Sequence, residues 1–283
     1  MSIKVLIAGA NSYIGDSFHD YLERFPGAYQ TDILETKRLK PSPADFQGYD
    51  VVFCVTGVAH IKETAANRNL YYSVNRDLVV ELAENAKKVG VKQFVLLSSM
   101  AVYGATVGHI TKQTAPSPVT AYGKSKLQAD EAIKKLEDDS FIFTCLRPPM
   151  VYGRNCRGNY QRLRKLALKF PLFPRYKNKR SMIYIDNLCE FIKVVIDKQK
   201  RGLFTPQNAE YVTTSEMVSL IAAANNKHIR FTSLFNWGIS LGRKAGIGIV
   251  NKVFGDLTYE PEDTVDRYSF QESIELTENG NVL

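Results

Sequence analysis

A tyrosine and a lysine four residues apart are the first candidates for chemistry in this sequence. Tyr122 and Lys126 lie in a segment with helical periodicity, where residues four apart share one face. A phenol with an ordinary pKa of about 10 is a poor base near neutral pH, and an adjacent ammonium stabilises the phenolate. Ser99 lies 23 residues before Tyr122, directly after an apolar run. We expect Tyr122 to move a hydroxyl proton while Ser99 hydrogen-bonds the same oxygen.

A glycine-containing turn near the N-terminus supplies the context for this pair. Residues 9–15 (Gly-Ala-Asn-Ser-Tyr-Ile-Gly) follow the apolar run Val5–Ala8 and open a helical segment. Gly9 permits a tight turn, Gly15 lets helix and strand pack closely, and the helix N-terminus attracts a pyrophosphate. Such a turn also occurs in plain connections, and a Tyr-x-x-x-Lys pair also occurs on plain helix surfaces. The order of turn, serine and pair favours a dinucleotide-dependent enzyme.

The cofactor would be NAD or NADP, and the sequence leaves that choice open. An acidic residue at the end of the second strand normally binds the adenosine ribose. Asp32 and Glu35 both qualify, and Glu35 is favoured because positions 33 and 34 have the pattern of the last buried ones. Lys37 and Arg38 follow and would neutralise a 2′-phosphate. The expected contacts from the turn are Gly9, Asn11, Ser12, Tyr13, Ile14 and Gly15.

Strand-length apolar runs alternate with helix-period segments through the first half of the chain. This alternation is typical of a doubly wound α/β fold, with a parallel sheet and helices on both faces. We expect a dinucleotide-binding Rossmann domain over residues 1–150, then a smaller C-terminal substrate lobe over 151–283 with segments that return to the core. The expected strands are Val5–Ala8, Ala28–Leu34, Val51–Val55, Phe94–Leu97 and Phe141–Leu146. The expected helices are Ser12–Phe25, Leu70–Val89, Tyr122–Leu136, Tyr160–Lys169, Asn187–Lys198 and Ser215–Ala224.

Composition and charge limit the class of protein. Of the 283 residues 45% are apolar, and no long biased tract occurs, so the chain is expected to fold throughout. The net charge of +8 is concentrated between Arg154 and Arg180, where ten Lys or Arg occur without an acidic residue. Such a stretch is commonly a solvated basic face or a weak nucleic-acid patch. The acidic segment 256–278 is expected to run over the surface.

The scattered positions of the cysteines and histidines and the absence of long apolar stretches predict a soluble, cytoplasmic protein without a metal. Cys54, Cys145, Cys156 and Cys189 are far apart and mostly lie in apolar runs, so buried free thiols are expected. No secretory signal and no membrane-length apolar window is present. Residues 235–254 mix apolar residues with Lys and Arg, as helices that bind a membrane surface do. Their several glycines weaken any helix there, so an ordinary lobe helix is expected in place of a membrane-binding one.

Five motifs together resemble the extended short-chain dehydrogenases, in particular the NAD-dependent epimerase/dehydratase family that acts on nucleotide sugars. They are G-A-N-S-Y-I-G at 9–15, S-S-M-A-V-Y-G at 98–104, Y-G-K-S-K at 122–126, R-P-P-M-V-Y-G at 147–153 and R-S-M-I-Y-I-D-N-L at 180–188. The resemblance covers residues 3 to 208 and implies a catalytic trio of Ser99, Tyr122 and Lys126. It also implies cofactor contacts at Thr56, Gly57, Asn75 and Ser98, and nucleotide contacts at Asn159, Phe173 and Arg180.

The resemblance implies a UDP-sugar 4-epimerase that uses NAD(P) in surface-polysaccharide precursor synthesis. It also implies a homodimer through the helices at 70–89 and 122–136. Two departures are visible, because Ser12 replaces the usual middle glycine and the chain is shorter than typical epimerases. A reductase of UDP-linked 4-keto-6-deoxy sugars is the alternative. A non-catalytic cofactor sensor or RNA-binding relative would have a broken trio, and Ser99, Tyr122 and Lys126 are all present. Neither a nucleic-acid nor a membrane partner is expected.

Overall fold

The computed structural model describes residues 2–36, 41–59, 61–265 and 267–280. The chain divides into two compact units, each assembled from several segments. Unit 1 contains Met1–Gly104, Pro116–Pro148 and Cys189–Pro206, and unit 2 contains Ala105–Ala115, Pro149–Leu188 and Gln207–Leu283. Segments from both halves of the sequence therefore contribute to unit 1.

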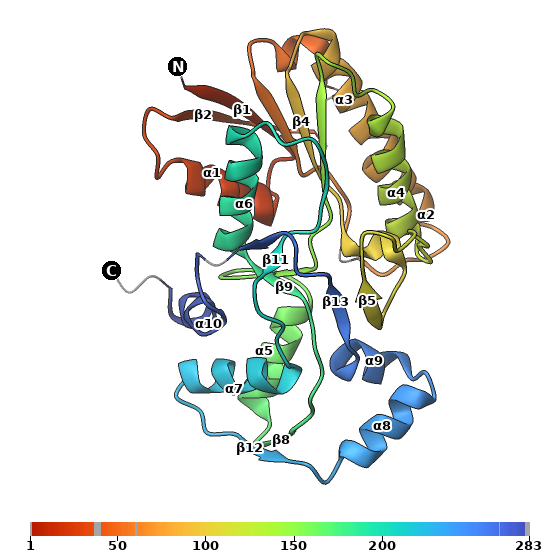
Figure 1. Cartoon of the computed structure of the whole chain (residues 1–283), viewed down its shortest axis with the longest axis vertical. Helices are drawn as coiled ribbons and strands as arrows, with labels where there is room; N and C mark the ends of the chain where they lie inside the picture. The colour runs from red at the N-terminus through yellow and green to blue at the C-terminus, as the bar shows by residue number, and fades with distance from the viewer. Residues whose placement is uncertain (1, 37–40, 60, 266, 281–283) are drawn as a thin grey trace. The chain divides into compact units, whose positions relative to one another are not determined.

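A six-stranded parallel sheet forms the centre of unit 1 (Figure 1). Its order is β10-β6-β4-β3-β1-β2. The strands are β1 (Ile3–Ala8), β2 (Tyr29–Leu34), β3 (Val51–Cys54), β4 (Gln93–Leu97), β6 (Ile142–Leu146) and β10 (Gly202–Phe204). β1 lies between β2 and β3, so the direction in which strands are added reverses at the boundary between β1 and β3. The predicted doubly wound α/β fold is confirmed.

Helices cover both faces of this sheet because its strands are apolar on both sides. On one face α3 (Val79–Lys88) and α4 (Ala121–Lys134) lie side by side, and their buried residues share a core with alternate strand residues such as Leu6 and Val52 (Figure 1). On the other face lie α1 (Tyr13–Leu22) and α6 (Ile185–Asp197) (Figure 1). There Phe18 of α1 packs edge-on against Phe53 of β3, with ring centroids 5.2 Å apart.

The helix predicted over residues 70–89 is built in three parts. It begins as α2 (Arg68–Tyr72), continues through a π-helical segment (Ser73–Leu78), and ends as α3. The π-helical segment is a local widening that often occurs at functional sites. Its one fully buried side chain, among those the structure describes, belongs to Asn75.

Unit 2 combines short parallel strand pairs with helices. The pairs are β7 (Met150–Tyr152) with β9 (Met182–Tyr184), β8 (Leu172–Pro174) with β12 (Arg230–Thr232), β5 (Gly108–Ile110) with β13 (Leu257–Tyr259), and β11 (Gln207–Asn208) with β14 (Thr264–Val265). The helices are α5 (Asn159–Lys169), α7 (Thr214–Ala224), α8 (Asn236–Lys244), α9 (Gly248–Phe254) and α10 (Phe270–Asn279). Helices therefore form in 235–254 despite the glycines there.

The expectation that the acidic end runs over the surface is wrong for part of that segment. All three residues of β13 are buried. In α10 the side chain of Glu278 is 1% exposed and accepts hydrogen bonds from Tyr160, Arg164 and Asn225 at 2.6–2.7 Å. These three donors offset the cost of burying a carboxylate, which composition alone could not indicate.

All four cysteines are buried and unpaired, as predicted. Within the described residues, no helix is both long enough and apolar enough to cross a membrane.

Candidate active site

The glycine turn after β1 is pressed against the end of β3. Gly9 has a φ of 127°, and a Cβ atom there would lie 2.9 Å from the backbone nitrogen of Thr56. At Gly15 a Cβ atom would lie 2.9 Å from Cγ2 of Val55. The backbone N–H of Gly9 donates to the Leu34 carbonyl at 3.0 Å, which ties the turn to the end of β2. Glycine is therefore required at both ends of this turn.

The same turn lies at the topological switch point between β1 and β3, where ligands of open α/β sheets bind. Ser12 caps α1, and its Oγ accepts a hydrogen bond from the Gly15 N–H at 3.4 Å. Asn11 has a φ of 60°, a conformation that asparagine adopts more readily than most residues. Ser12, Tyr13 and Ile14 are half-buried, and N–H groups in the first turn of a helix suit an anion such as a pyrophosphate. The residues present fit a dinucleotide, and serine serves as the helix cap where the family has glycine.

The two acidic candidates for the ribose occupy different places. Asp32 lies inside β2 and accepts a 2.9 Å hydrogen bond from the Tyr49 hydroxyl, whose pKa is raised to about 12 by partial burial and by this contact. Glu35 is half-buried and directly follows β2, beside the carbonyl that binds Gly9. The burial expected before Glu35 is wrong at Ile33, which is 39% exposed, and the choice of Glu35 stays a prediction. Lys37 and Arg38 lie outside the described residues.

Lys126 places a buried ammonium at the carboxyl ends of two central strands. Its side chain is almost fully buried, and Nζ donates to the Leu97 carbonyl at 3.0 Å and the Thr56 carbonyl at 3.4 Å. A Cβ atom at Gly57 would lie 3.2 Å from this Nζ and 3.2 Å from Oδ1 of Asn75, so glycine leaves room for both groups. The structure thus brings Thr56, Gly57, Asn75 and Lys126 together.

Asn75 fixes the segment that follows β3. Its Oδ1 accepts from the Val58 N–H at 2.6 Å, and its Nδ2 donates to the Val58 carbonyl at 3.1 Å and to the Ser125 hydroxyl at 3.3 Å. Thr56 is held in a similar way, because its hydroxyl donates to the Ala8 carbonyl at 3.0 Å. These contacts join β1, β3, the π-helical segment and α4 around the ammonium.

Tyr122 is the second residue of α4, one helical turn before Lys126. The helix is capped by Thr120, whose Oγ1 accepts from the Gly123 N–H at 3.1 Å. The Tyr122 ring is half-buried and meets the Tyr71 ring edge-on, with centroids 6.3 Å apart and planes at 68°. Tyr122 and Lys126 therefore share one face of α4, as the spacing predicts.

Ser99 caps the short helix Met100–Tyr103 that follows β4. Its Oγ accepts a hydrogen bond from the Ala101 N–H at 3.2 Å. A Cβ atom at Gly123 would lie 2.6 Å from the Ala101 carbonyl oxygen. The turn that carries Ser99 therefore packs directly on the first turn of the helix that carries Tyr122.

A buried charged network supports this turn, and the sequence analysis missed it. Asp130 accepts at Oδ2 from the Ser98 hydroxyl at 2.9 Å and from Arg147 Nε at 3.1 Å. Arg147 also donates to the Tyr103 hydroxyl at 3.1 Å. Burial raises the pKa of the Asp130 carboxyl, while the Arg147 guanidinium opposes that shift. Asp130 lies four residues after Lys126, and Arg147 opens one of the quoted motifs, but nothing in their spacing indicates that the two side chains pair.

The three predicted nucleotide contacts lie in unit 2. Asn159 is exposed at the start of α5. Arg180 donates to the Gly255 carbonyl at 3.0 Å, and burial lowers the pKa of its guanidinium, so a nearby anion would stabilise its charge. Phe173 is buried and packs against Phe231 and Phe254, with centroids 6.4 and 5.9 Å away. Phe173 thus belongs to the core of unit 2, and its contact with a base stays a prediction.

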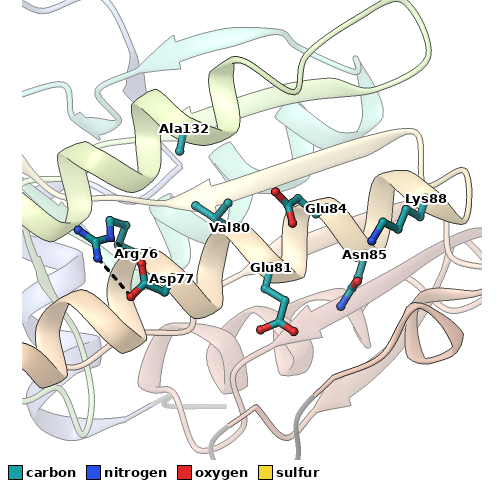
Figure 2. A pocket seen from close by; sticks show the side chains of 8 residues that line it. All are labelled: Arg76, Asp77, Val80, Glu81, Glu84, Asn85, Lys88 and Ala132. Atoms are coloured by element: carbon teal, nitrogen blue, oxygen red, sulfur yellow. Dashed lines mark hydrogen bonds and ion pairs between the residues drawn. The ribbon is translucent and has the colours of Figure 1, made fainter.

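A surface pocket of about 540 Å³ lies along the helices predicted to form a dimer (Figure 2). Figure 2 shows mostly charged side chains there, with Arg76 paired to Asp77 at 2.6 Å. None of the predicted site residues lines it. Among the residues that the structure describes, one group could hold a metal, namely the surface cluster of half-buried His19 with exposed Asp20 and Glu23. Neither feature includes Lys126 or the residues grouped with it, which are Thr56, Gly57 and Asn75.

Comparisons with known proteins agree with this fold. The chain is 26% identical over 248 residues to the N-acetyl-alpha-D-glucosaminyl-diphospho-ditrans,octacis-undecaprenol 4-epimerase of Escherichia coli O157:H7, covering 81% of this chain and 74% of that protein. It is 34% identical over 188 residues to the UDP-glucose 4-epimerase of Vibrio cholerae, covering 62% of this chain and 57% of that protein.

Solved structures share the fold at lower identity. A UDP-glucuronic acid 4-epimerase from Bacillus cereus in complex with NAD has a TM-score of 0.76 at 16% identity, covering 98% of this chain and 96% of that one. A dTDP-4-dehydrorhamnose reductase from Bacillus anthracis in complex with NADP has a TM-score of 0.67 at 20% identity, covering 84% and 86%. A model of the NAD dependent epimerase/dehydratase family matches residues 5–205. The chain therefore belongs to the NAD dependent epimerase/dehydratase family.

Proposed function

We propose that the protein is a 4-epimerase of UDP-linked sugars, with Tyr122, Lys126 and Ser99 as its catalytic residues. The observation that carries the proposal is the buried ammonium of Lys126, bonded to the carbonyls of Leu97 and Thr56 on the same helix face as Tyr122. A structural role alone would not require a lysine that is 4% exposed at the ligand-binding edge of the sheet.

Each residue of the trio has a distinct task in this mechanism. Tyr122 takes the proton from the sugar hydroxyl and later returns it, and Lys126 stabilises the phenolate between these steps. Ser99 donates a hydrogen bond to the reacting oxygen and stabilises its developing charge. A bound nicotinamide ring would supply the hydride chemistry at the sugar carbon. The intact trio argues against a non-catalytic cofactor sensor.

We propose NAD as the preferred cofactor because of Glu35. A carboxylate directly after β2 suits the two ribose hydroxyls of NAD and repels the 2′-phosphate of NADP. The first turn of α1 would bind the pyrophosphate, with Gly9, Asn11, Ser12, Tyr13, Ile14 and Gly15 as contacts. Replacing Glu35 by Gln should reduce the preference for NAD over NADP, measured as the ratio of the two dissociation constants.

The cofactor balance separates an epimerase from the alternative, a reductase of UDP-linked 4-keto sugars. The purified protein is denatured, released nicotinamide is identified, and consumption of added NADH or NADPH is followed with a UDP-sugar and with a UDP-4-keto sugar. An epimerase releases NAD and interconverts C4 epimers without net consumption. A protein that arrives empty and consumes reduced cofactor with the keto sugar is a reductase, and the epimerase proposal fails.

The same assay tests which group, a nucleotide or a lipid, is attached to the sugar through the diphosphate. We propose that Arg180 and Asn159 bind the diphosphate, since a planar guanidinium suits bidentate phosphate contacts. Because the Escherichia coli relative is named for a lipid-linked sugar, the substrate panel includes a polyprenyl-diphosphate sugar beside the UDP-sugars. If the protein turns over the lipid-linked sugar and none of the UDP-sugars, the proposal of a nucleotide-linked substrate fails.

A further inference from the structure

The helical hairpin of α8 and α9 exposes several large apolar side chains. Leu234, Trp237 and Ile249 are 77%, 75% and 68% exposed, and three further residues are about half exposed or more: Phe235, Leu241 and Ile247. All six lie between positions 234 and 249. Single exposed apolar residues are normal on a protein surface, whereas such a concentration marks a binding surface. We call residues 234–252 the apolar hairpin.

The apolar hairpin makes specific polar contacts within unit 2. Arg243 forms an ion pair with Asp256 at 2.8 Å and donates to the Tyr176 hydroxyl at 3.1 Å. The two helices pack through Gly242, where a Cβ atom would lie 3.3 Å from Val250. The hairpin is therefore held by these contacts, while its six large apolar side chains stay exposed.

The charged residues within the apolar hairpin itself are all basic. The sequence from Met217 to Gly255 has no Asp or Glu, and it contains five basic residues: Lys227, Arg230, Arg243, Lys244 and Lys252. Arg230, Lys244 and Lys252 are exposed. This charge pattern complements a negatively charged surface. A second copy of the same hairpin would bring like charges together, which disfavours self-association through it.

We propose that the apolar hairpin binds the surface of an anionic lipid bilayer. Trp237, Leu241 and Ile249 would enter the boundary between headgroups and acyl chains, while Lys244 and Lys252 would pair with lipid phosphates. Trp237 is well suited to this place because its ring is apolar and its indole N–H remains near water. The proposal replaces the expectation of no membrane partner, and it does not depend on the chemistry proposed for unit 1.

The 283-residue chain contains its own probe, because Trp237 is its one tryptophan. Emission is recorded during titration with vesicles of phosphatidylcholine mixed with phosphatidylglycerol, and with vesicles of phosphatidylcholine alone. The anionic vesicles should shift the emission to shorter wavelength and carry the protein down in sedimentation, and salt should weaken both effects. Unchanged emission with anionic vesicles overturns the proposal.

Variants separate membrane binding from other causes. Leu241→Ser with Lys252→Glu should weaken sedimentation with anionic vesicles at least tenfold. The matched control is Val119→Ser with Lys135→Glu, which changes an apolar residue that is 71% exposed and an exposed lysine in unit 1 and should leave binding unchanged. An emission shift that follows protein concentration without lipid, and that the first variant abolishes, would identify a second copy as the partner and overturn the proposal.

Discussion

Replacing Gly123 by Ala tests whether the close contact between the Ser99 turn and α4 positions the catalytic residues. The new Cβ atom would lie 2.6 Å from the Ala101 carbonyl oxygen, and ordinary contact begins at 3.4 Å, so the backbone must move by 0.8 Å. Overpacking of this kind costs about 1–3 kcal/mol, against a gain of at most about 1 kcal/mol in helix propensity. We expect the free energy of unfolding to fall by about 1–2 kcal/mol.

The same displacement should slow catalysis by more than it destabilises the fold. A shift near 1 Å between reacting groups costs about 10²-fold in rate, so kcat should fall by about 10- to 100-fold. The matched control is Gly238→Ala in α8, where no described heavy atom lies within 4 Å of the new Cβ atom. This control should raise the unfolding free energy by about 0.5–1 kcal/mol and leave kcat unchanged. If Gly123→Ala keeps the wild-type kcat in steady-state assays, the reasoning is refuted.

Three further substitutions probe the supporting contacts. Asp130→Asn should lower kcat and move the rising limb of the kcat pH profile to lower pH. The reason is that loss of a negative charge near Lys126 makes the phenolate of Tyr122 easier to form. An unshifted profile would mean that the Asp130 carboxyl is already protonated in the wild-type protein. Glu278→Ala should lower the free energy of unfolding, measured by urea denaturation, by about 3 kcal/mol because three donors lose a charged acceptor. The control Glu275→Ala changes an exposed residue of the same helix and should alter this free energy by less than about 0.5 kcal/mol. Arg180→Lys should raise KM for the nucleotide sugar about tenfold with a smaller effect on kcat, since lysine lacks the bidentate geometry of the guanidinium. An unchanged KM would mean that Arg180 does not bind the diphosphate.

Much of unit 1 could be predicted because its signals are local. The alternation of strand and helix periods gave the parallel sheet, and the spacing of Tyr122 and Lys126 gave their shared helix face. The positions of Gly9 and Gly15 likewise indicated the tight turn after β1. Each of these features depends on residues close together in the chain, where periodicity and turn chemistry are informative.

The remaining features depend on contacts between distant parts of the chain. Asp130 meets Arg147 across 17 residues, and Glu278 meets Arg164 across 114, so neither pair leaves a pattern in a sequence window. The same holds for Phe173, whose environment is set by Phe231 and Phe254. The apolar hairpin could be seen in the sequence as a mixture of apolar and basic residues, but the exposure of Trp237 required coordinates.

The most direct test of the account compares the wild-type protein with Tyr122→Phe, which removes one hydroxyl and keeps the ring. Both proteins are assayed for interconversion of a UDP-sugar and its C4 epimer, and nicotinamide released on denaturation is quantified. We expect both to carry NAD in similar amounts, with turnover of the variant reduced by at least about 10²-fold, as for loss of a general acid–base group. Wild-type turnover in Tyr122→Phe would contradict the assignment of the catalytic residues.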